Sequence, residues 1–243
     1  MYRKYVKALV LFFPLLMFLP SCIMYHPQTA DIPLIEKKGD LRVEASAWTS
    51  ALMTPDAIGG SATVSYGLTD WMAGQLHASL QDGKNYNLQA AAGTYTTFER
   101  AVLEVYAGVN YGKSYKDIGS TRKYTQEIAS GSASTYFAQV NFGWNHLLKS
   151  HLDVGFGLKI GAFNPNYSCI GHGGEAVGKG DLLSEMTQHQ ALVEPRVFLR
   201  VGGESVKLQL GIAYCQFSGS GFSDNSHFQY DPLSVSLGLS YRF

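Results

Sequence analysis

The sequence lacks net charge. Its 19 lysine and arginine residues balance 19 aspartate and glutamate residues, and charged residues make up only 16% of the chain. A nucleic-acid-binding protein normally gathers an excess of basic residues on one face. We therefore expect no nucleic-acid partner.

Long apolar runs are also missing after residue 22, where none approaches the roughly 20 residues that a membrane-spanning helix needs. The chain is instead rich in glycine (26) and in tyrosine and phenylalanine (15 and 13). This composition, without a long apolar run, is typical of an all-β membrane barrel rather than of a helical membrane protein. The length predicts a single domain.

Residues 1–21 have the layout of a secretory signal peptide, with a basic start followed by an apolar stretch that ends near Pro20. A transmembrane anchor is the alternative. The apolar stretch is too short for one, and Pro14 and Pro20 disfavour a continuous helix.

The residues "LPSC", which end at Cys22, resemble a bacterial lipobox. The resemblance implies that Cys22 becomes the mature N-terminus and carries acyl chains, and three such chains suffice for stable membrane anchoring. Ile23 follows the cysteine; the absence of aspartate there favours the outer membrane over the inner one. We expect residues 22–38 to form a periplasmic tether and residues 39–243 to form the barrel.

The chain ends in "PLSVSLGLSYRF", in which every second residue from Leu233 to Phe243 is large and apolar. A period of two predicts a strand with one apolar and one polar face. Ten such stretches recur, each about as long as a tilted strand that crosses a bilayer. They cover residues 40–48, 61–68, 71–80, 86–95, 101–111, 134–144, 151–163, 191–201, 206–216 and 232–243.

Short connections at residues 67–70, 96–100, 145–151 and 202–205 take turns with connections that are mostly longer. The longest run through residues 112–132, 164–189 and 218–231. Short periplasmic turns and long external loops are typical of outer-membrane barrels. We therefore predict a transmembrane antiparallel up-and-down barrel of about ten strands with both termini periplasmic; a soluble β-sandwich is the alternative.

The aromatic residues of the apolar face favour the barrel, because they gather where the strands end, as the aromatic girdles of a membrane barrel do. Near short connections these are Tyr66, Trp144, Tyr241 and Phe243, and near long ones Tyr111, Tyr136 and Tyr214.

The terminal "SYRF" resembles the C-terminal signature of outer-membrane barrel proteins, whose last aromatic residue is recognised by the insertion machinery. Together with the lipobox it makes the chain similar to small outer-membrane barrel lipoproteins of the Bacteroidota type. The resemblance implies an outer-membrane location, a lipid in the periplasmic leaflet and a contact between Phe243 and the insertion machinery. The last strand must pair with the first, because an open sheet edge cannot exist in lipid.

The polar face of the predicted strands carries charges of both signs near the periplasmic end. These are Arg42, Glu44, Glu104, Asp153, Arg200, Lys207 and Arg242. We expect Arg242 to lie beside Glu44 and Asp153 to lie beside Arg200. A small barrel has little spare interior, so an ion-pair network that fills the lumen is the leading interpretation. A selectivity constriction in a narrow pore is the alternative.

Catalytic motifs are weak. His77 and Ser79 share a strand face and resemble the His-x-Ser of outer-membrane lipid deacylases, but the strand supplies no carboxylate to orient the histidine. Ten strands also resemble the omptin proteases, although the spacing of Asp224, His227 and Asp231 does not match an omptin motif.

The connection at residues 164–189 contains His172, Glu175 and Asp181, whose spacing defines no metal site. We expect no catalytic residue, cofactor or metal. Cys169 and Cys215 fall at the external end on neighbouring segments, which leaves open both a disulfide and two free thiols.

We therefore expect a lipid-anchored outer-membrane barrel with a structural or accessory role. Its partners would be outer-membrane lipid and any protein bound through the external loops. A narrow passive channel is the second hypothesis, and an enzyme acting on lipid or peptide is the third.

Overall fold

The computed structural model describes residues 23–25, 32–50, 58–121, 123–173, 180–218 and 227–243. Cys22, Glu175 and Asp224 lie outside them. The wall strands are β2 (Leu41–Ser50), β3 (Ile58–Gly67), β4 (Met72–Gln81), β5 (Asn85–Phe98), β6 (Ala101–Gly119), β7 (Gln126–His146), β8 (Leu152–His172), β10 (Gln190–Gly202), β11 (Val206–Tyr214) and β14 (Leu233–Arg242). Shorter elements are β1 (Ile23–Tyr25), α2 (Leu147–Ser150), β9 (Asp181–Met186), β12 (Gln216–Ser218) and β13 (Gln229–Tyr230).

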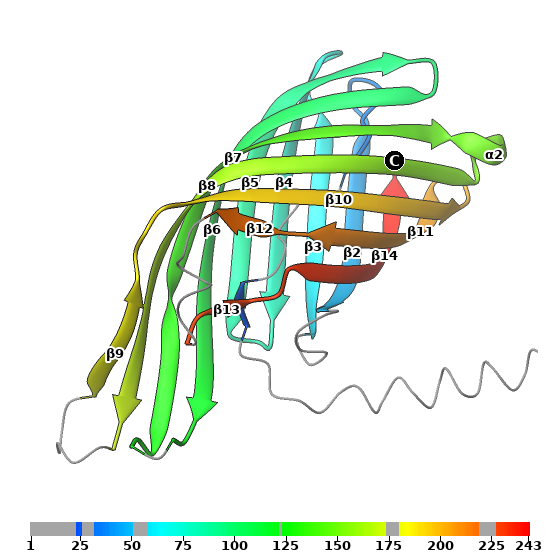
Figure 1. Cartoon of the computed structure of the whole chain (residues 1–243). Helices are drawn as coiled ribbons and strands as arrows, with labels where there is room; N and C mark the ends of the chain where they lie inside the picture. Colours follow the sequence, from blue (N-terminus) through cyan, green and yellow to red (C-terminus); the bar gives the residue numbers. More distant parts are fainter. Residues whose placement is uncertain (1–22, 26–31, 51–57, 122, 174–179, 219–226) are drawn as a thin grey trace, which may run out of the picture.

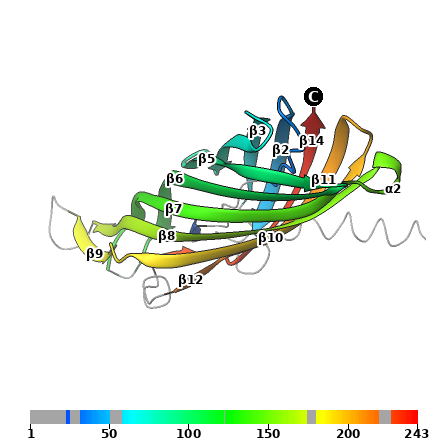
Figure 2. The ribbon, with the colours of Figure 1, turned by 90° about the horizontal axis from the view of Figure 1, so that it is seen from above.

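The ten wall strands form a closed antiparallel barrel, which confirms the predicted fold (Figures 1 and 2). The last strand β14 pairs with the first strand β2 over nine residue pairs, from Ser234↔Ser50 to Arg242↔Arg42. β12 continues the line of β11 along β10 after an interruption at Cys215. No helix of the described residues is long and apolar enough to cross a membrane.

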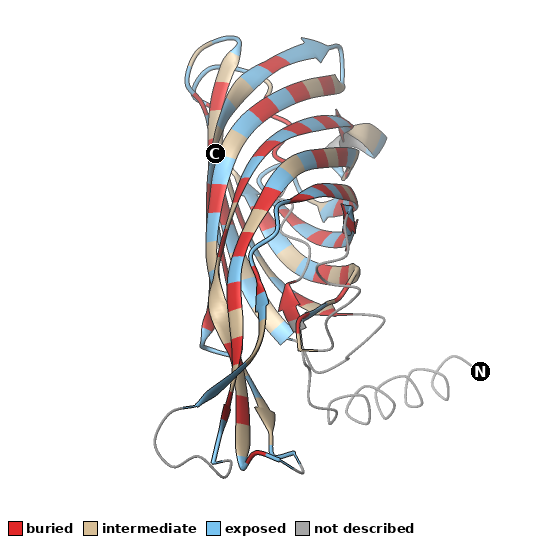
Figure 3. Cartoon of the chain, turned by 60° about the vertical axis from the view of Figure 1, so that its left-hand side comes forward, coloured by how far each residue is buried: buried red, intermediate tan, exposed pale blue. Residues whose placement is uncertain are grey.

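Buried and exposed residues alternate along the strands (Figure 3). The outward face is apolar, and all seven aromatic residues predicted for its two ends are exposed: Tyr66, Trp144, Tyr241, Phe243, Tyr111, Tyr136 and Tyr214. The inward face is polar and buried. This inside-out pattern is the reverse of a soluble barrel with an apolar core.

One end of the barrel carries the short connections and will be called the short-turn end. It holds the β3–β4, β5–β6 and β10–β11 turns, the helix α2 and the C-terminal residue Phe243. The other end, the long-loop end, holds the remaining connections, including the tight turn at Asp82–Gly83, where both residues have positive φ as an Asp-Gly hairpin requires.

At the long-loop end, much of residues 112–132 and 164–189 is strand rather than loop, contrary to the sequence-based expectation. β7 and β8 are each 21 residues long and stay paired from Trp144↔Val154 out to Gln126↔His172. β6 accompanies them, and β9 extends this projecting sheet at the edge of β8 (Figure 1). Backbone pairing therefore continues beyond the apolar band, with register irregularities at Asp117/Gly119 and Cys169/Ile170.

The segment expected to be a tether lies partly inside the barrel. Ile32, Leu34 and Ile35 have no exposed surface, and Met24 and Tyr25 are almost fully buried. Residues 37–39 are exposed at the short-turn end. The prediction of a solvated tether from 22 to 38 is therefore corrected for these buried residues. Removing these apolar side chains from water stabilises the buried position.

Candidate functional site

The lumen is the candidate site, and its charged residues form discrete pairs near the short-turn end. The Arg200 guanidinium is ion-paired with Glu44, and its Nε donates to Gln209 Oε1 at 2.5 Å. Its Nη2 also donates to the carbonyl of Ile32 at 2.6 Å, so Arg200 ties the buried N-terminal segment to the wall. The cation lies 4.1 Å from the ring centre of Phe198.

Asp153 organises a second group. Its Oδ1 lies 2.5 Å from Lys207 Nζ and accepts the backbone N–H of His146 at 3.0 Å, while Oδ2 lies 3.8 Å from Arg42 Nη1. Arg200 is directly opposite Asp153 in the β8–β10 register, as expected, but its ion pair is with Glu44. Lys207 and Arg42 both lie near Asp153, whereas the ion pair of Arg200 is with Glu44.

Arg242 also differs from its predicted pairing. The β14–β2 register places Ser240, not Arg242, opposite Glu44, and the Ser240 hydroxyl donates to that carboxylate at 3.3 Å. Arg242 lies at the end of its strand and reaches the residues before β2. Its Nη2 is 2.7 Å from Glu36 Oε2 and 2.8 Å from Asp40 Oδ2.

Glu104 has no cation at ion-pair distance among the described residues. Its Oε1 accepts the backbone N–H of Ile35 at 2.7 Å, and its Oε2 accepts Asn141 Nδ2 at 2.9 Å. Asn145 Nδ2 donates to the carbonyl of Leu34 at 2.9 Å. Glu104 therefore binds the backbone of the N-terminal segment, and its partner in the described part of the chain is not an arginine or lysine side chain.

A buried pair in the middle of the lumen was missed by the sequence analysis. Lys159 Nζ lies 3.2 Å from Glu194 Oε2 and donates to Gln89 Oε1 at 3.0 Å, and neither charged side chain has exposed surface. The Tyr25 hydroxyl donates to Glu194 Oε1 at 2.7 Å. Lys159 and Glu194 face each other in the β8–β10 register, so strand parity and register together could have identified them.

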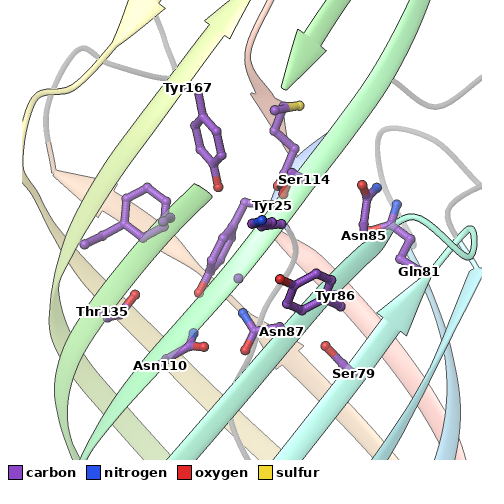
Figure 4. Close-up of a pocket in the computed structure, with 15 residues that line it drawn as sticks. Tyr25, Ser79, Gln81, Asn85, Tyr86, Asn87, Asn110, Ser114, Thr135 and Tyr167 are labelled. Atoms are coloured by element: carbon purple, nitrogen blue, oxygen red, sulfur yellow. Dashed lines mark hydrogen bonds between the residues drawn. The ribbon is translucent and has the colours of Figure 1, made fainter. Parts of the chain in front are cut away.

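Aromatic residues gather in the lumen toward the long-loop end, where Tyr25, Tyr86 and Tyr167 lie around one cavity (Figure 4). Tyr25 makes edge-to-face contacts with Phe163 and Phe217, at ring-centre distances of 5.2 and 5.1 Å. The cavity bordered by Tyr25, Tyr167 and Asn110 has a volume of about 30 Å³, and the one between Arg42, Asp153 and Arg242 about 10 Å³. Each of these volumes is comparable with the space that a single water molecule needs.

The described candidate catalytic residues lie in two separate places, on β4 and in the connection before β14. His77 is buried, with Nδ1 at 2.8 Å from the hydroxyl of Thr63, and Ser79 is two residues further along the inward face. His227 lies 3.1 Å from the Ser184 hydroxyl, and Asp231 accepts the backbone N–H of Leu233.

Of the three residues whose spacing defines no metal site, Asp181 accepts the Tyr124 hydroxyl at 2.9 Å, and the backbone carbonyl of His172 accepts the N–H of Thr125. The described residues contain no group of three or more histidine, cysteine, aspartate or glutamate side chains that could hold a metal ion.

Cys169 and Cys215 are buried free thiols in one aromatic cluster, so the disulfide that the sequence left open is not formed. The Cys215 thiol donates to the carbonyl of Asp231 at 3.5 Å. Burial among Phe163, Phe217 and their neighbours stabilises the thiols as small apolar side chains.

No protein-family model and no curated protein sequence matches the chain. Among solved structures, it is similar to the outer membrane protease OmpT from Escherichia coli, at a TM-score of 0.53 and 8% identity over 84% of this chain and 94% of OmpT. The translocator domain of the autotransporter NalP from Neisseria meningitidis (TM-score 0.45, 10% identity, 85% and 89% covered) and the KdgM porin (0.40, 9%, 83% and 99%) also match. The likeness to OmpT shows that the chain has the fold of outer-membrane β-barrels.

Proposed function

We propose that the protein is a closed, non-conducting outer-membrane barrel, anchored by lipid on Cys22, with a structural or accessory role. In this proposal any protein partner binds through the long-loop end. One observation carries it: buried ion pairs and the segment at residues 32–36 occupy the lumen together.

The contacts of this segment indicate that it is bound stably to the inner wall of the barrel. Three of its backbone groups bond to buried wall side chains, namely Arg200, Glu104 and Asn145. Removing any one partner would leave a buried polar group unsatisfied, at about 1–3 kcal/mol each. The lumen of a ten-stranded barrel is narrow even without such a segment.

Single-channel recording of the purified protein in planar bilayers tests the proposal. We expect no stable conductance steps from the full-length mature chain. A matched variant that lacks residues 23–36 should conduct, provided that it keeps the heat-modifiable migration of a folded barrel. Stable, charge-selective steps from the unmodified protein would instead support the second hypothesis, a narrow passive channel.

An enzymatic role is tested separately. Replacing His77 and Ser79 by alanine should leave the acylation of lipid A unchanged in cells, because His77 Nδ1 lies at hydrogen-bond distance from the wall hydroxyl of Thr63, as a structural side chain of the lumen would. If a deacylated lipid A species were lost in the variant, the protein would be a lipid A deacylase.

A further inference from the structure

We propose that the N-terminal part of the chain threads the lumen, with residues 23–25 at the long-loop end and residues 32–36 at the short-turn end, so that the mature N-terminus leaves the barrel at the long-loop end. Lipid on Cys22 would then enter the leaflet that surrounds the long-loop end, not the periplasmic leaflet. The lipid part rests on the proposed function; the threading stands on contacts of the described residues.

The N-terminal end of the segment is held at the long-loop end. β1 pairs in parallel with β13, with Ile23 opposite Gln229 and Tyr25 opposite Tyr230, and β13 belongs to the connection that leads into β14. The Ser114 hydroxyl donates to the carbonyl of Met24 at 2.8 Å. Ser114 itself lies in the part of β6 beyond its last pair with β5, Tyr86↔Lys113.

The other end of the segment is held at the short-turn end. Ile32 and Leu34 pack with Val102 and Phe198, and Ile35 packs with Ala73 and other inward residues near the β3–β4 turn. Gly39 then donates to the carbonyl of Gly67, and β2 begins at Leu41. The chain therefore enters the lumen at one end and leaves it at the other.

The barrel wall is shaped for this segment at Gly157. A Cβ added there would come within 2.8 Å of Ile32 Cδ1 and 2.9 Å of the Asn141 side chain, and no backbone atom is among its nearest contacts. Glycine at this inward position thus makes room for the Ile32 side chain.

The length of the chain is sufficient for threading. Seven peptide steps separate Tyr25 from Ile32, and an extended chain covers up to about 3.5 Å per residue, or about 25 Å. The apolar band of an outer-membrane barrel is also about 25 Å tall. Contacts of Tyr25 with Glu194 and of Ile32 with Arg200 are therefore compatible with a single extended passage.

Epitope accessibility on cells tests this topology. One variant carries a short epitope between Cys22 and Ile23, and two controls carry it in the Asp82–Gly83 turn at the long-loop end or between Gly203 and Glu204 at the short-turn end. We expect antibody to reach the N-terminal epitope and the Asp82–Gly83 epitope on intact cells, but to reach the Gly203–Glu204 epitope only after permeabilisation. An N-terminal epitope that behaves like the one at Gly203–Glu204 overturns the threading.

Mass spectrometry of the mature N-terminus separates the two parts of the argument. A surface-accessible epitope on a chain without acyl groups would leave the threading intact, and would refute the lipid anchor of the proposed function and the leaflet assignment. An acylated chain whose N-terminal epitope is hidden on intact cells would support the lipid anchor and would refute the threading.

A disulfide test needs no insertion. In a Cys169→Ser, Cys215→Ser background, Tyr25→Cys and Tyr230→Cys should form a disulfide that changes migration in non-reducing gels, because the two residues are strand partners. Tyr25→Cys with Glu204→Cys, at opposite ends of the barrel, should not. Absence of the first disulfide in folded protein contradicts the threaded position of β1.

Discussion

Arg200 and Glu44 form a buried ion pair between β10 and β2, two wall strands that are separated by β11 and β14. The pair therefore crosses part of the lumen instead of linking neighbouring strands. It joins β2, which forms the seam with the last strand, to β10, and Arg200 also binds the carbonyl of Ile32.

We predict strong coupling between these two residues. Glu44→Gln or Arg200→Gln alone should each lower the free energy of unfolding by about 3–5 kcal/mol, because each leaves a buried charge without its main partner. The double variant should lose much less than the sum, as a double-mutant cycle in urea would measure. Glu44→Gln with Arg242→Gln is the comparison pair, and its coupling should be weaker, because the ion pair of Glu44 is with Arg200 whereas those of Arg242 are with Glu36 and Asp40.

Gly157→Ala should destabilise the barrel through Ile32. The added methyl group would overlap Ile32 Cδ1 at 2.8 Å, and overpacking of this kind costs about 1–3 kcal/mol. In an Ile32→Ala background the same change should cost distinctly less, since the overlapping atoms are gone. Equal costs in both backgrounds, measured by denaturant unfolding, would show that Ile32 does not occupy this gap.

We predict that acid lowers the stability of the folded barrel by protonating Glu36 at the short-turn end. Burial alone would raise the pKa of Glu36, but the hydrogen bond and positive charge of Arg242 outweigh it and lower the pKa below the usual 4.5. A lowered folded-state pKa contributes stability above the unfolded pKa, and this is lost as pH falls through the folded value.

The unfolding temperature of the wild-type chain should therefore fall more steeply below pH 4.5 than that of Glu36→Gln. The variant should be the less stable of the two at pH 7. Parallel curves for the two proteins would contradict a role for the Glu36–Arg242 pair.

Cys169 and Cys215 should react with a maleimide only after unfolding. Both thiols are fully buried, with relative exposures of 0%. Labelling followed by mass spectrometry should give near-zero modification of the folded barrel and two modified cysteines in urea. Modification of the folded form within minutes would contradict the packing at the long-loop end. So would thiols that stay unmodified in urea until a reductant is added, because that would show a disulfide.

Deleting residues 241–243 should block assembly. Arg242 donates its backbone N–H to the carbonyl of Ser205, and Phe243 donates to that of Leu41, so these residues complete the pairing of the last strand with both neighbours. The deletion also removes Arg242 from Glu36 and Asp40. We expect loss of heat-modifiable migration, whereas Phe243→Tyr should retain it.

The wall of the barrel was predictable because a period of two is a local signal. Val206 to Tyr214 alternates without interruption, and parity alone placed Lys207 inward and Leu208 outward, as observed. All seven predicted lumen charges lie on the inward face for the same reason. Closure between β14 and β2 followed from the requirement that lipid tolerates no free strand edge.

The pairing of the charges was not predictable in the same way. Long arginine side chains can choose among several carboxylates, and that choice depends on strand register and on what else enters the lumen. Of the two partners of Arg242, Glu36 lies outside the alternating stretches and Asp40 is the first residue of one. Ile32, Leu34 and Ile35 form a short apolar group without period, which a sequence pattern cannot distinguish from a linker.

The length of β7 and β8 has a mechanical consequence. Twenty-one residues at about 3.3 Å each extend roughly 70 Å, which at a tilt near 40° rises about 50 Å along the barrel axis. The apolar band accounts for only about 25 Å of this height. The remainder, paired with β6 and β9, is about as tall as the band itself, and it carries the ends of β7 and β8 beyond the headgroups to where a large neighbouring molecule can touch them.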